Sequence, residues 1–429
     1  MPLDPDKQRK FAVDVVRTLR SHGYEAYWAG GCVRDRLLGR LPKDYDVATT
    51  ARPDEIREVF SRKRTVPIGA QFGVITVLGP KPAGQIEVAT FREDASYSDG
   101  RRPDSVEFST PEADAHRRDF TINGLFYDPL EDRVIDYVGG VDDLGRGVVR
   151  AIGEPRARFE EDKLRLLRAV RFTVTFGFAL DMPTRDAIEH MASQIGVVSV
   201  ERIADEMRRM LMHDSRAKAL DLLHEVDLLP QILPELDAAN DAAATTAAGM
   251  RGDVAWLAAL ATLDLLSEPP FPLALAALLV PFVDAAAARG LTARWKLSNH
   301  ESRSLCWLVE QQAALVEAEQ MAWSRLQPLL VHDGAEDLIA LHGALAEVPA
   351  IDRPAASRAD LARCRRMLAR PALELNPPPL VTGDDLIRLG IPRSKAYQRL
   401  LQAARDAQLD GLIQTKAQAL ELVKRLLNE

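Results

Sequence analysis

The sequence predicts an α+β protein in which a mixed head comes first and an all-α part follows. In the first 150 residues, short runs rich in β-branched and aromatic side chains alternate with helical stretches, and Gly and Pro separate them. From about Pro155 onward the pattern changes to long helix-period segments rich in Ala, Leu and Arg. A chain of 429 residues with 47% hydrophobic side chains can bury a sizeable core in both parts.

Six segments of the head have a pattern typical of one kind of secondary structure. Runs of β-branched and aromatic residues predict strands, and the stretches between them predict short helices. In chain order we expect a strand over residues 24–28, a helix over 33–38, a strand over 45–49, a helix over 54–60, and strands over 73–78 and 85–91. The last two flank a stretch rich in Gly and Pro, which predicts a hairpin.

The helical part begins with a clear stripe of apolar residues. Leu164, Leu167, Val170 and Val174 recur at helix spacing, which predicts one helix over residues 156–176. Further along the chain, clusters of Pro mark candidate joints. We therefore expect four parts, namely a head over residues 1–154, a neck over 155–235, a body over 236–377 and a tail over 378–429.

Composition limits the compartment and the partners. The net charge of −8 argues against a global positive field that binds nucleic acid, so a polyanionic partner must meet local basic patches. Three widely spaced cysteines exclude a disulfide framework and a thiolate zinc site. The longest apolar stretch, residues 271–283, is shorter than the roughly 20 residues of a membrane helix. With no export signal at the N-terminus, we expect a cytoplasmic protein without a membrane partner.

A Gly-Gly turn between the first expected strand and helix is the first candidate site. Gly30 and Gly31 allow the backbone to approach an anion, and Arg34 adds a guanidinium fork suited to phosphate. The turn is therefore a candidate phosphate site, with a purely structural helix start as the alternative.

Three carboxylates form the second candidate site. Asp44 and Asp46 are two apart in a strand-like run, which places both on one face. Glu87 is a single acid in an apolar strand pattern. If the two strands are neighbours, the three acids can hold two Mg²⁺ ions about 4 Å apart, as in nucleotidyl transfer. The alternative for Asp44 and Asp46 is a charge pair on an edge strand.

These motifs and their order resemble the family of class II tRNA nucleotidyltransferases and bacterial poly(A) polymerases, which belongs to the DNA polymerase β superfamily. The resemblance runs through G-G-x-V-R-D, D-x-D, E-V-A-T-F-R and R-R-D-F-T-I-N over residues 24–180. It implies a polymerase β-type nucleotidyltransferase head followed by an all-α neck, body and tail. It also implies that Gly30, Gly31 and Arg34 hold the triphosphate and that Asp44, Asp46 and Glu87 bind the metals. Residues 94–104 resemble the flexible loop of the family.

A third motif is similar to the ribose-recognition motif of that family and contains Arg118, Asp119 and Asn123. Asp119 and Asn123 are four apart on an expected helix, so both side chains could reach one sugar hydroxyl. A surface helix with a salt bridge is the alternative.

The motif that most narrows the function contains Asp162 and Arg165. On one helix these are i,i+3 neighbours, which present an acceptor beside a fork of donors. The pair matches the edge of C or A better than that of U or G, and it resembles the amino-acid template of the family. Arg168 and Arg171 continue the same face and direct positive charge toward the phosphates or the primer, with a solvated helix face as the alternative.

The resemblance implies an enzyme that adds C, C and A to the acceptor end of tRNA from CTP and ATP, with tRNA and not DNA as its nucleic-acid partner. A poly(A) polymerase on the same scaffold, or an enzyme that adds only A, is the alternative. Residues 380–411 are similar to the tail of tRNA nucleotidyltransferases, except that Pro392, Arg393 and Ser394 stand where many relatives have Pro-Gly. The pair His332 and Asp333 lacks the further ligands of a phosphohydrolase, so we interpret it as a helix-ending turn.

Overall fold

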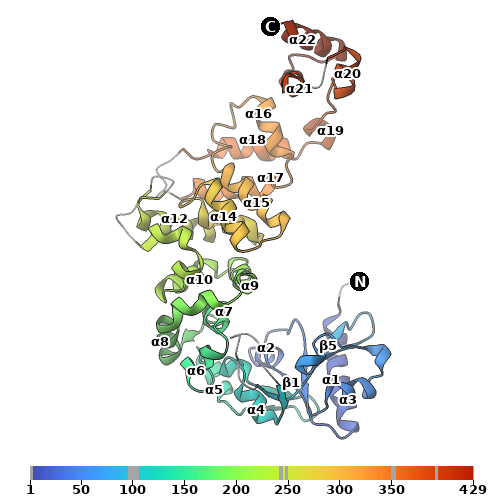
Figure 1. The fold of residues 1–429 in the computed structure, drawn as a ribbon, viewed down its shortest axis with the longest axis vertical. Coiled ribbons are helices and arrows are strands. Elements are labelled where there is room, and N and C mark those ends of the chain that lie inside the picture. Colours follow the sequence, from blue (N-terminus) through green and yellow to red (C-terminus); the bar gives the residue numbers. More distant parts are fainter. Residues whose placement is uncertain are drawn as a thin grey trace. The chain divides into compact units, whose positions relative to one another are not determined.

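The computed structural model describes residues 3–94, 106–240, 245–246, 250–348, 354–391 and 395–428. The chain forms two compact units, each with its own core (Figure 1). Unit 1 contains Met1–Met210 and Lys218–Pro234, and unit 2 contains Leu211–Ala217 and Glu235–Glu429. The mixed sheet lies in unit 1 and unit 2 is helical, which confirms the α+β prediction. The finer division into head, neck, body and tail stays a prediction.

Unit 1 is built on a seven-stranded mixed sheet with the order β3-β4-β5-β2-β1-β8-β9. The strands are β1 (Ala26–Ala29), β2 (Asp46–Thr49), β3 (Thr65–Val66), β4 (Val74–Leu78), β5 (Gln85–Thr90), β8 (Phe126–Asp128) and β9 (Arg133–Ile135). Within the sheet only β2 and β5 pair in parallel, and β4 and β5 form the expected antiparallel hairpin. The predicted strands are therefore confirmed to within about two residues.

Helices α1 (Pro5–Ser21) and α3 (Pro53–Val59) pack against the sheet, and α2 (Gly31–Leu37) follows β1 directly (Figure 1). The side chains of β5 alternate between the two faces of the sheet. Ile86 and Val88 are completely buried on the face that α1 and α3 cover, while Glu87 between them is exposed on the opposite face. The opposite face carries a smaller aromatic cluster around Phe91 and Phe126. The acid therefore lies on the face away from the main core.

The rest of unit 1 is mostly helical. Its elements include β6 (Arg92–Asp94), β7 (Val106–Phe108), α4 (Pro111–His116), α5 (Gly140–Arg146), β10 (Val148–Val149), α6 (Pro155–Glu161), α7 (Leu164–Phe176), β11 (Ala179–Leu180), α8 (Met182–Met191), α9 (Val200–Leu211) and α10 (Arg216–Glu225), of which the last two cross the boundary between the units. The two-residue strand β11 is an exception to the all-helical prediction after residue 155. The loop expected over residues 94–104 lies outside the described residues, apart from Asp94 at the end of β6.

The single helix predicted over residues 156–176 is wrong, since the chain forms α6 and α7 with a break at Asp162. Asp162 is extended, with φ −151° and ψ 104°. Its carboxylate accepts a hydrogen bond from the backbone N–H of Leu164 at 3.1 Å. Asp side chains often compete with helical hydrogen bonds in this way, and here the competition ends one helix and begins the next.

Unit 2 packs helices around a buried central one. The helices are α12 (Gly252–Asp264), α13 (Phe271–Leu279), α14 (Ala285–Arg294), α15 (Asn299–Glu310), α16 (Trp323–Leu330), α17 (Ala335–Ala346), α18 (Arg358–Leu368), α19 (Ala372–Leu375), α20 (Gly383–Arg388), α21 (Lys395–Leu409) and α22 (Lys416–Asn428). All residues of α13 are buried, as expected for a helix that is apolar on every side. A separate apolar cluster joins α20, α21 and α22. His332 and Asp333 lie in the turn between α16 and α17, as interpreted from the sequence.

One close backbone contact locks the start of α5 against the segment that contains Asn123. A Cβ atom on Gly140 would lie 2.2 Å from the backbone oxygen of Thr121, a distance at which the backbone must shift. We expect Gly140→Ala to lower the free energy of unfolding by about 1–3 kcal/mol, because overpacking forces such shifts. Urea unfolding followed by circular dichroism measures the change.

Gly145→Ala is the matched control in the same helix, because a Cβ there meets no atom within 4 Å. It should be neutral or stabilise by up to about 1 kcal/mol through helix propensity. Equal losses in the two variants would contradict the packing argument.

Candidate functional site

Three acidic side chains lie at one end of the parallel pair β2 and β5. Asp46 is the first residue of β2, and its register partner in β5 is Glu87. Asp44 precedes β2 in a bend and not in the strand itself, which begins at Asp46, one residue after the predicted start. All three side chains are exposed and line one cavity of about 750 Å³. The structure therefore brings the three predicted acids together.

The charges of these acids act on one another. Asp46 reaches solvent at the cavity, but protein atoms surround it on its other sides. This desolvation, followed by repulsion from Asp44 and Glu87, raises the pKa of Asp46 to about 6. A divalent cation between the carboxylates would relieve this repulsion. Within the described ranges, no three His, Cys, Asp or Glu side chains lie so that they could together hold a metal ion. The oxygen donors still suit Mg²⁺, which commonly binds one or two carboxylates and completes its shell with water and substrate phosphates.

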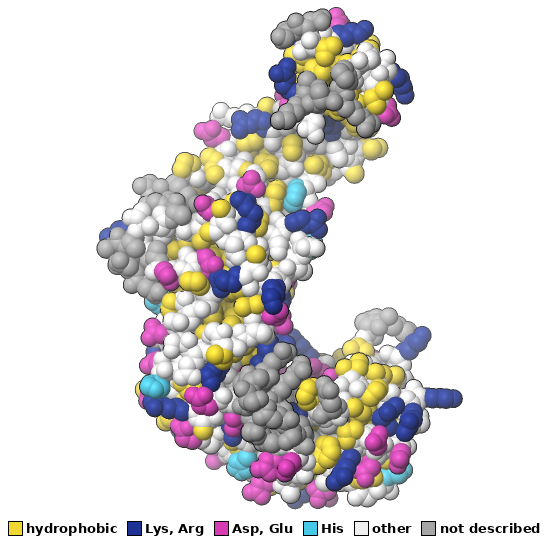
Figure 2. Space-filling model, in the orientation of Figure 1, with side chains coloured by type: hydrophobic (Ala, Val, Ile, Leu, Met, Phe, Trp, Pro, Cys, Tyr) yellow, Lys and Arg dark blue, Asp and Glu magenta, His cyan; other side chains and the backbone are white. Residues whose placement is uncertain are grey.

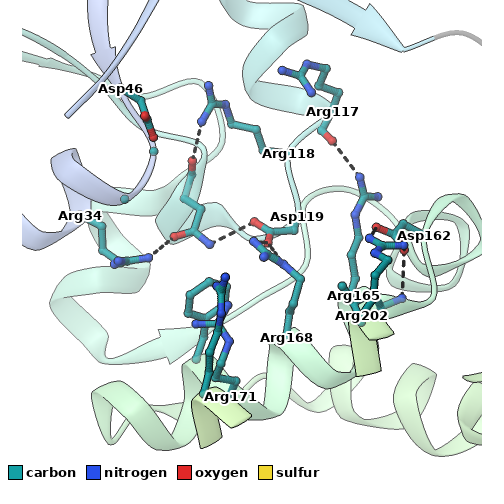
Figure 3. A pocket seen from close by; sticks show the side chains of 16 residues that line it. Arg34, Asp46, Arg117, Arg118, Asp119, Asp162, Arg165, Arg168, Arg171 and Arg202 are labelled. Carbon is teal, nitrogen blue, oxygen red and sulfur yellow. Dashed lines mark hydrogen bonds and ion pairs between the residues drawn. The ribbon is translucent and has the colours of Figure 1, made fainter. Parts of the chain in front are cut away.

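The Gly-Gly turn connects β1 to α2 beside these acids. Gly30 has φ +69°, a conformation that other residues rarely adopt, and a Cβ there would lie 2.8 Å from Nη1 of Arg118. α2 begins at Gly31, two residues before the predicted start, so Gly31 belongs to the first turn of the helix. Arg34 in α2 is buried, donates to Oδ1 of Asn123 at 2.6 Å and stacks on Phe176 at 4.5 Å. Both glycines and Arg34 line a cavity of about 580 Å³ (Figure 3).

Asp119 is the centre of a buried polar network in this cavity (Figure 3). Its carboxylate accepts hydrogen bonds from Nδ2 of Asn123 at 3.1 Å and from Nε of Arg168 at 2.9 Å. Burial alone would raise the pKa of Asp119, but the charge and hydrogen bonds of Arg168, with the bond from Asn123, lower it to about 2. Asp119 is thus an ionised carboxylate that ties the head to α7.

The helix predicted around Asp119 and Asn123 is wrong, although the two side chains do meet. α4 ends at His116, and Asn123 lies in a short 3-10 turn over Thr121–Asn123. The N–H of Phe120 bonds to the carboxylate of Asp119, which again shows an Asp side chain replacing a helical contact.

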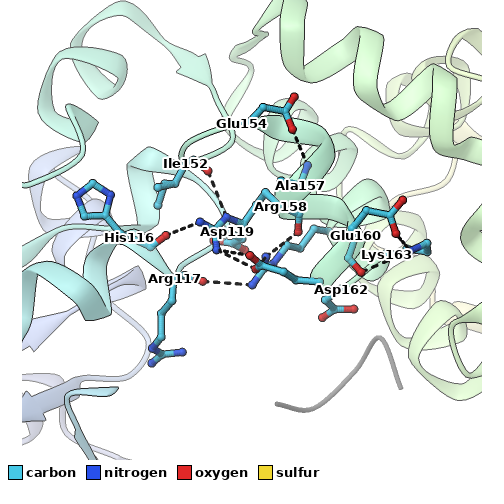
Figure 4. A network of polar contacts seen from close by, with 12 residues as sticks. His116, Arg117, Asp119, Ile152, Glu154, Ala157, Arg158, Glu160, Asp162 and Lys163 are labelled. Atoms are coloured by element: carbon cyan, nitrogen blue, oxygen red, sulfur yellow. Dashed lines mark hydrogen bonds and ion pairs between the residues drawn. The ribbon is translucent and has the colours of Figure 1, made fainter. Parts of the chain in front are cut away.

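Asp162 and Arg165 also line the cavity, but they are not neighbours on one helix turn (Figure 3). Asp162 lies at the break before α7, and Arg202 of α9 binds both its oxygens at 3.1 and 2.7 Å. Arg165 donates to Glu161 at 2.6 Å and to the backbone oxygens of Arg158 and Arg117 at 2.7 and 3.2 Å. Figure 4 shows this network of side chains and backbone oxygens around the break.

The remaining hydrogen-bond capacity of this pair can be counted. A carboxylate has about four lone-pair positions, and Asp162 uses three of them, two for Arg202 and one for Leu164. A guanidinium has five N–H groups, and Arg165 uses three. Within the described residues, the pair therefore keeps one acceptor position, on Oδ2 of Asp162, and two donors.

The cavity is strongly positive in a protein with an overall negative charge. Eight arginines and three aspartates line it, which leaves a formal charge of +5. Its arginines are Arg34, Arg117, Arg118, Arg165, Arg168, Arg171, Arg202 and Arg209. On the face drawn in Figure 2, basic and acidic side chains elsewhere lie interspersed. The cavity is thus a local basic patch of the kind that the sequence predicts for binding a polyanionic ligand.

Sequence reasoning missed three of these arginines. Arg117 is the first residue of the R-R-D-F-T-I-N motif, so its place in the cavity could have been predicted. Arg202 and Arg209 lie in α9, about 40 residues after Asp162, and no local pattern links them to the cavity. Arg171 lines the cavity as expected, where it pairs with Glu206 and stacks on Phe172 at 4.1 Å.

Family models match two stretches of the chain. The model described as "Poly A polymerase head domain" matches residues 26–150. The model described as "Probable RNA and SrmB- binding site of polymerase A" matches residues 177–240.

Several known proteins are similar to the chain. The CCA-adding enzyme of Geobacillus thermodenitrificans is 44% identical over 218 residues, or 51% of this chain and 53% of its own. The poly(A) polymerase I of Haemophilus influenzae is 36% identical over 55% of this chain and 54% of its own. The CCA-adding enzyme of Lactobacillus delbrueckii subsp. bulgaricus is 33% identical over 95% of this chain and 96% of its own. The chain thus spans about half the length of the first relatives it matches, and nearly all of the last.

A solved structure covers nearly the whole chain. The crystal structure of the Bacillus stearothermophilus CCA-adding enzyme in complex with CTP superposes with a TM-score of 0.73, at 27% identity, over 98% of both chains. Among the helices that the structure describes, none has the length and apolar content to cross a membrane.

The ion pair between Asp119 and Arg168 makes a prediction for stability. Because the pKa of Asp119 is lowered in the folded protein, the ionised carboxylate adds to the free energy of unfolding. This stabilisation is complete above the ordinary pKa of 3.8 and is lost as the pH falls toward about 2. We expect Arg168→Gln to lower the free energy of unfolding at pH 7 by about 2 kcal/mol or more, since it leaves a buried charge without its partner. The deficit should persist down to pH 4 and shrink below it, as urea unfolding at pH 7, 5 and 3.5 can measure.

Arg185→Gln serves as the control. Arg185 pairs with Glu189 and Glu225 at the surface, where ion pairs contribute about 1 kcal/mol at most. A loss as large in this variant as in Arg168→Gln would contradict the assignment of Asp119.

Proposed function

Because the chain belongs to the family of class II tRNA nucleotidyltransferases and bacterial poly(A) polymerases, we propose that it adds C, C and A to the 3′ end of tRNA from CTP and ATP. Its partners in this proposal are the acceptor end of tRNA and the two nucleotides, in the cytoplasm. The proposal rests on the hydrogen-bond positions that Asp162 and Arg165 keep free inside the cavity of about 580 Å³.

Base choice follows from that capacity. Cytosine and adenine each present an amino donor beside a ring-nitrogen acceptor on the pairing edge. Oδ2 of Asp162 can accept from the amino group, and a free N–H of Arg165 can donate to the ring nitrogen. Uracil and guanine present a carbonyl oxygen where C and A present the amino group, which would face the carboxylate. A missing or repulsive contact of this kind costs about 1–3 kcal/mol in a buried site.

The other residues support nucleotidyl transfer in this cavity and in the adjoining one that the three acids line, since Asp46 lines both. The 3′-hydroxyl of the tRNA attacks the α-phosphate, the bond to the β-phosphate breaks, and pyrophosphate leaves. Asp44, Asp46 and Glu87 would hold two Mg²⁺ ions, which when bound would supply Lewis-acid stabilisation of the charge on the phosphate and of the attacking oxygen. Arg34, Arg118, Arg168 and Arg171 offset the charge of the triphosphate, and Gly30 and Gly31 allow it to approach the backbone. Asn123 orients the ribose with its remaining amide N–H, and Asp119, whose four lone-pair positions are taken by Phe120, Asn123 and Arg168, holds Asn123 in place.

Poly(A) polymerase is the second candidate, because the Haemophilus influenzae relative and the head-domain model both point to it. An enzyme that adds only A is a third. The net charge of −8 and the nearly full-length match to a CCA-adding enzyme favour tRNA repair. Incubation with tRNA that lacks its last three nucleotides, with CTP and ATP separately and together, distinguishes them. We expect two C from CTP and a single A only after them, whereas long A tracts from ATP alone would show a poly(A) polymerase.

Replacement of Asp46 tests the proposed metal site. We expect Asp46→Asn to abolish nucleotide incorporation and to remove the rise in unfolding temperature that Mg²⁺ causes in the unchanged protein. Without Mg²⁺ at pH 8 the variant should be at least as stable, because Asp44 and Glu87 repel the ionised Asp46. Asp54→Asn, at an exposed acid of α3, should keep activity and the response to Mg²⁺. Normal turnover in Asp46→Asn would refute the assignment.

Replacement of Arg165 tests base choice. We expect Arg165→Ala to lower the preference for CTP and ATP over UTP and GTP by roughly tenfold to a hundredfold. Its affinity for tRNA should change less than threefold. Single-turnover incorporation of each nucleotide and filter binding of tRNA measure the two effects, with Arg185→Gln as the control. Unchanged selectivity with weaker tRNA binding would instead assign Arg165 to the RNA.

A further inference from the structure

A second basic cavity lies in unit 1, apart from the one that we assign to the nucleotide. Its volume is about 160 Å³, and its lining includes Arg9 of α1, Trp28 of β1, Arg36 of α2, and Arg40 and Tyr45 from the segment before β2. We call it the arginine cavity. Neither the carboxylates nor the residues of the nucleotide cavity line it.

The two cavities lie on opposite faces of the sheet. The register partner of Trp28 in β2 is Val47, which is the neighbour of Asp46. Because side chains alternate along a strand, Trp28 and Val47 point to one face and Asp46 to the other. The rings of Tyr45 and Tyr127 pack on Trp28 at 4.7 and 5.4 Å and extend its face. A ligand in the arginine cavity therefore lies behind the sheet from the proposed chemistry.

The charge of the arginine cavity is largely uncompensated. Arg36 donates to Tyr127 and to Asp132, whose side chain is 81% exposed. Within the described residues, Arg9 has no ion pair or hydrogen bond, and the guanidinium of Arg40 only stacks on Phe176 at 5.1 Å. Two guanidinium groups thus keep all their donors for a ligand, and guanidinium forks pair best with carboxylate or phosphate oxygens.

Trp28 gives an independent indication of a ligand. Its side chain is 1% exposed, and its Nε1–H is buried without an acceptor in the part of the chain that the structure describes. Nearly all buried donors in folded proteins have a partner, because an unmet one costs about 1–3 kcal/mol. An acceptor oxygen in the adjoining cavity would satisfy this group.

The size and charge of the arginine cavity together limit which ligands it can bind. The cavity is smaller than the roughly 300–1,000 Å³ of sites that enclose whole cofactors or drug-sized molecules. We propose that the arginine cavity binds a single phosphate group, with Arg9 and Arg40 paired to its oxygens and Trp28 donating to one of them. The group is either free phosphate or one phosphate of an RNA backbone. The site is separate from the proposed catalytic reaction, so either proposal can fail without the other.

Trp28 also provides the test. The sequence has five tryptophans, and the other four, Trp256, Trp295, Trp307 and Trp323, belong to unit 2. In the full chain labelled with ¹⁵N-tryptophan, the indole signal of Trp28 is identified by its loss in Trp28→Phe. We expect inorganic phosphate to shift this signal saturably, at constant ionic strength set with chloride, and to leave the other four in place.

Variants of the exposed arginines decide the assignment. Arg9→Gln combined with Arg40→Gln should weaken the phosphate-dependent shift at least tenfold. Arg17→Gln, an exposed arginine of α1 that pairs with Asp14, should leave it unchanged. A shift that survives in the double variant, or a Trp28 signal that neither phosphate nor RNA moves, would overturn the proposal.

A second titration distinguishes the two sources of phosphate. If tRNA without its last three nucleotides shifts the Trp28 signal at far lower concentration than phosphate, and the double variant loses this effect, the ligand is a backbone phosphate. If phosphate shifts the signal and tRNA does not, the ligand is free phosphate.

Discussion

The buried ion pair between Asp119 and Arg168 holds the nucleotide cavity together. It joins a loop of the head to the helix that follows the break at Asp162, and through Asn123 it continues to Arg34 beside the Gly-Gly turn. Each member of this chain of contacts also lines the cavity. One buried and ionised carboxylate therefore fixes Arg168 directly and Arg34 through Asn123, while Asp114 and Glu206 hold Arg118 and Arg171.

Charge is distributed unevenly in this protein, and the unevenness suits its proposed ligands. A negative chain that gathers eight arginines in one cavity repels nucleic acid in general and attracts a polyphosphate at one place. The three carboxylates beside the cavity work in the opposite sense, since they repel one another until a cation joins them. The two groups are complementary, because a metal-bound triphosphate presents negative charge to the arginines and positive charge to the acids.

The head and much of the site could be predicted from sequence because their signals are local. Alternation in β5 places Glu87 opposite its buried neighbours, and the spacing of Asp44 and Asp46 brings both to the same end of β2. The break at Asp162 could not be predicted from apolar periodicity, because the apolar stripe lies wholly in α7 and the break depends on a hydrogen bond from the backbone of Leu164 to the Asp162 carboxylate. Arg202 and Arg209 had no local signal at all, since only tertiary packing of α9 brings them to the cavity.

The break at Asp162 has a mechanical consequence. Rotation about the backbone bonds of this one residue can turn α6 relative to α7 while each helix keeps its internal hydrogen bonds. In an unbroken helix the same displacement would have to be shared by every turn that follows. The angle between the two helices can thus change at one residue, and under the proposed function a pocket that takes a small pyrimidine and then a larger purine can alter its depth there without being rebuilt.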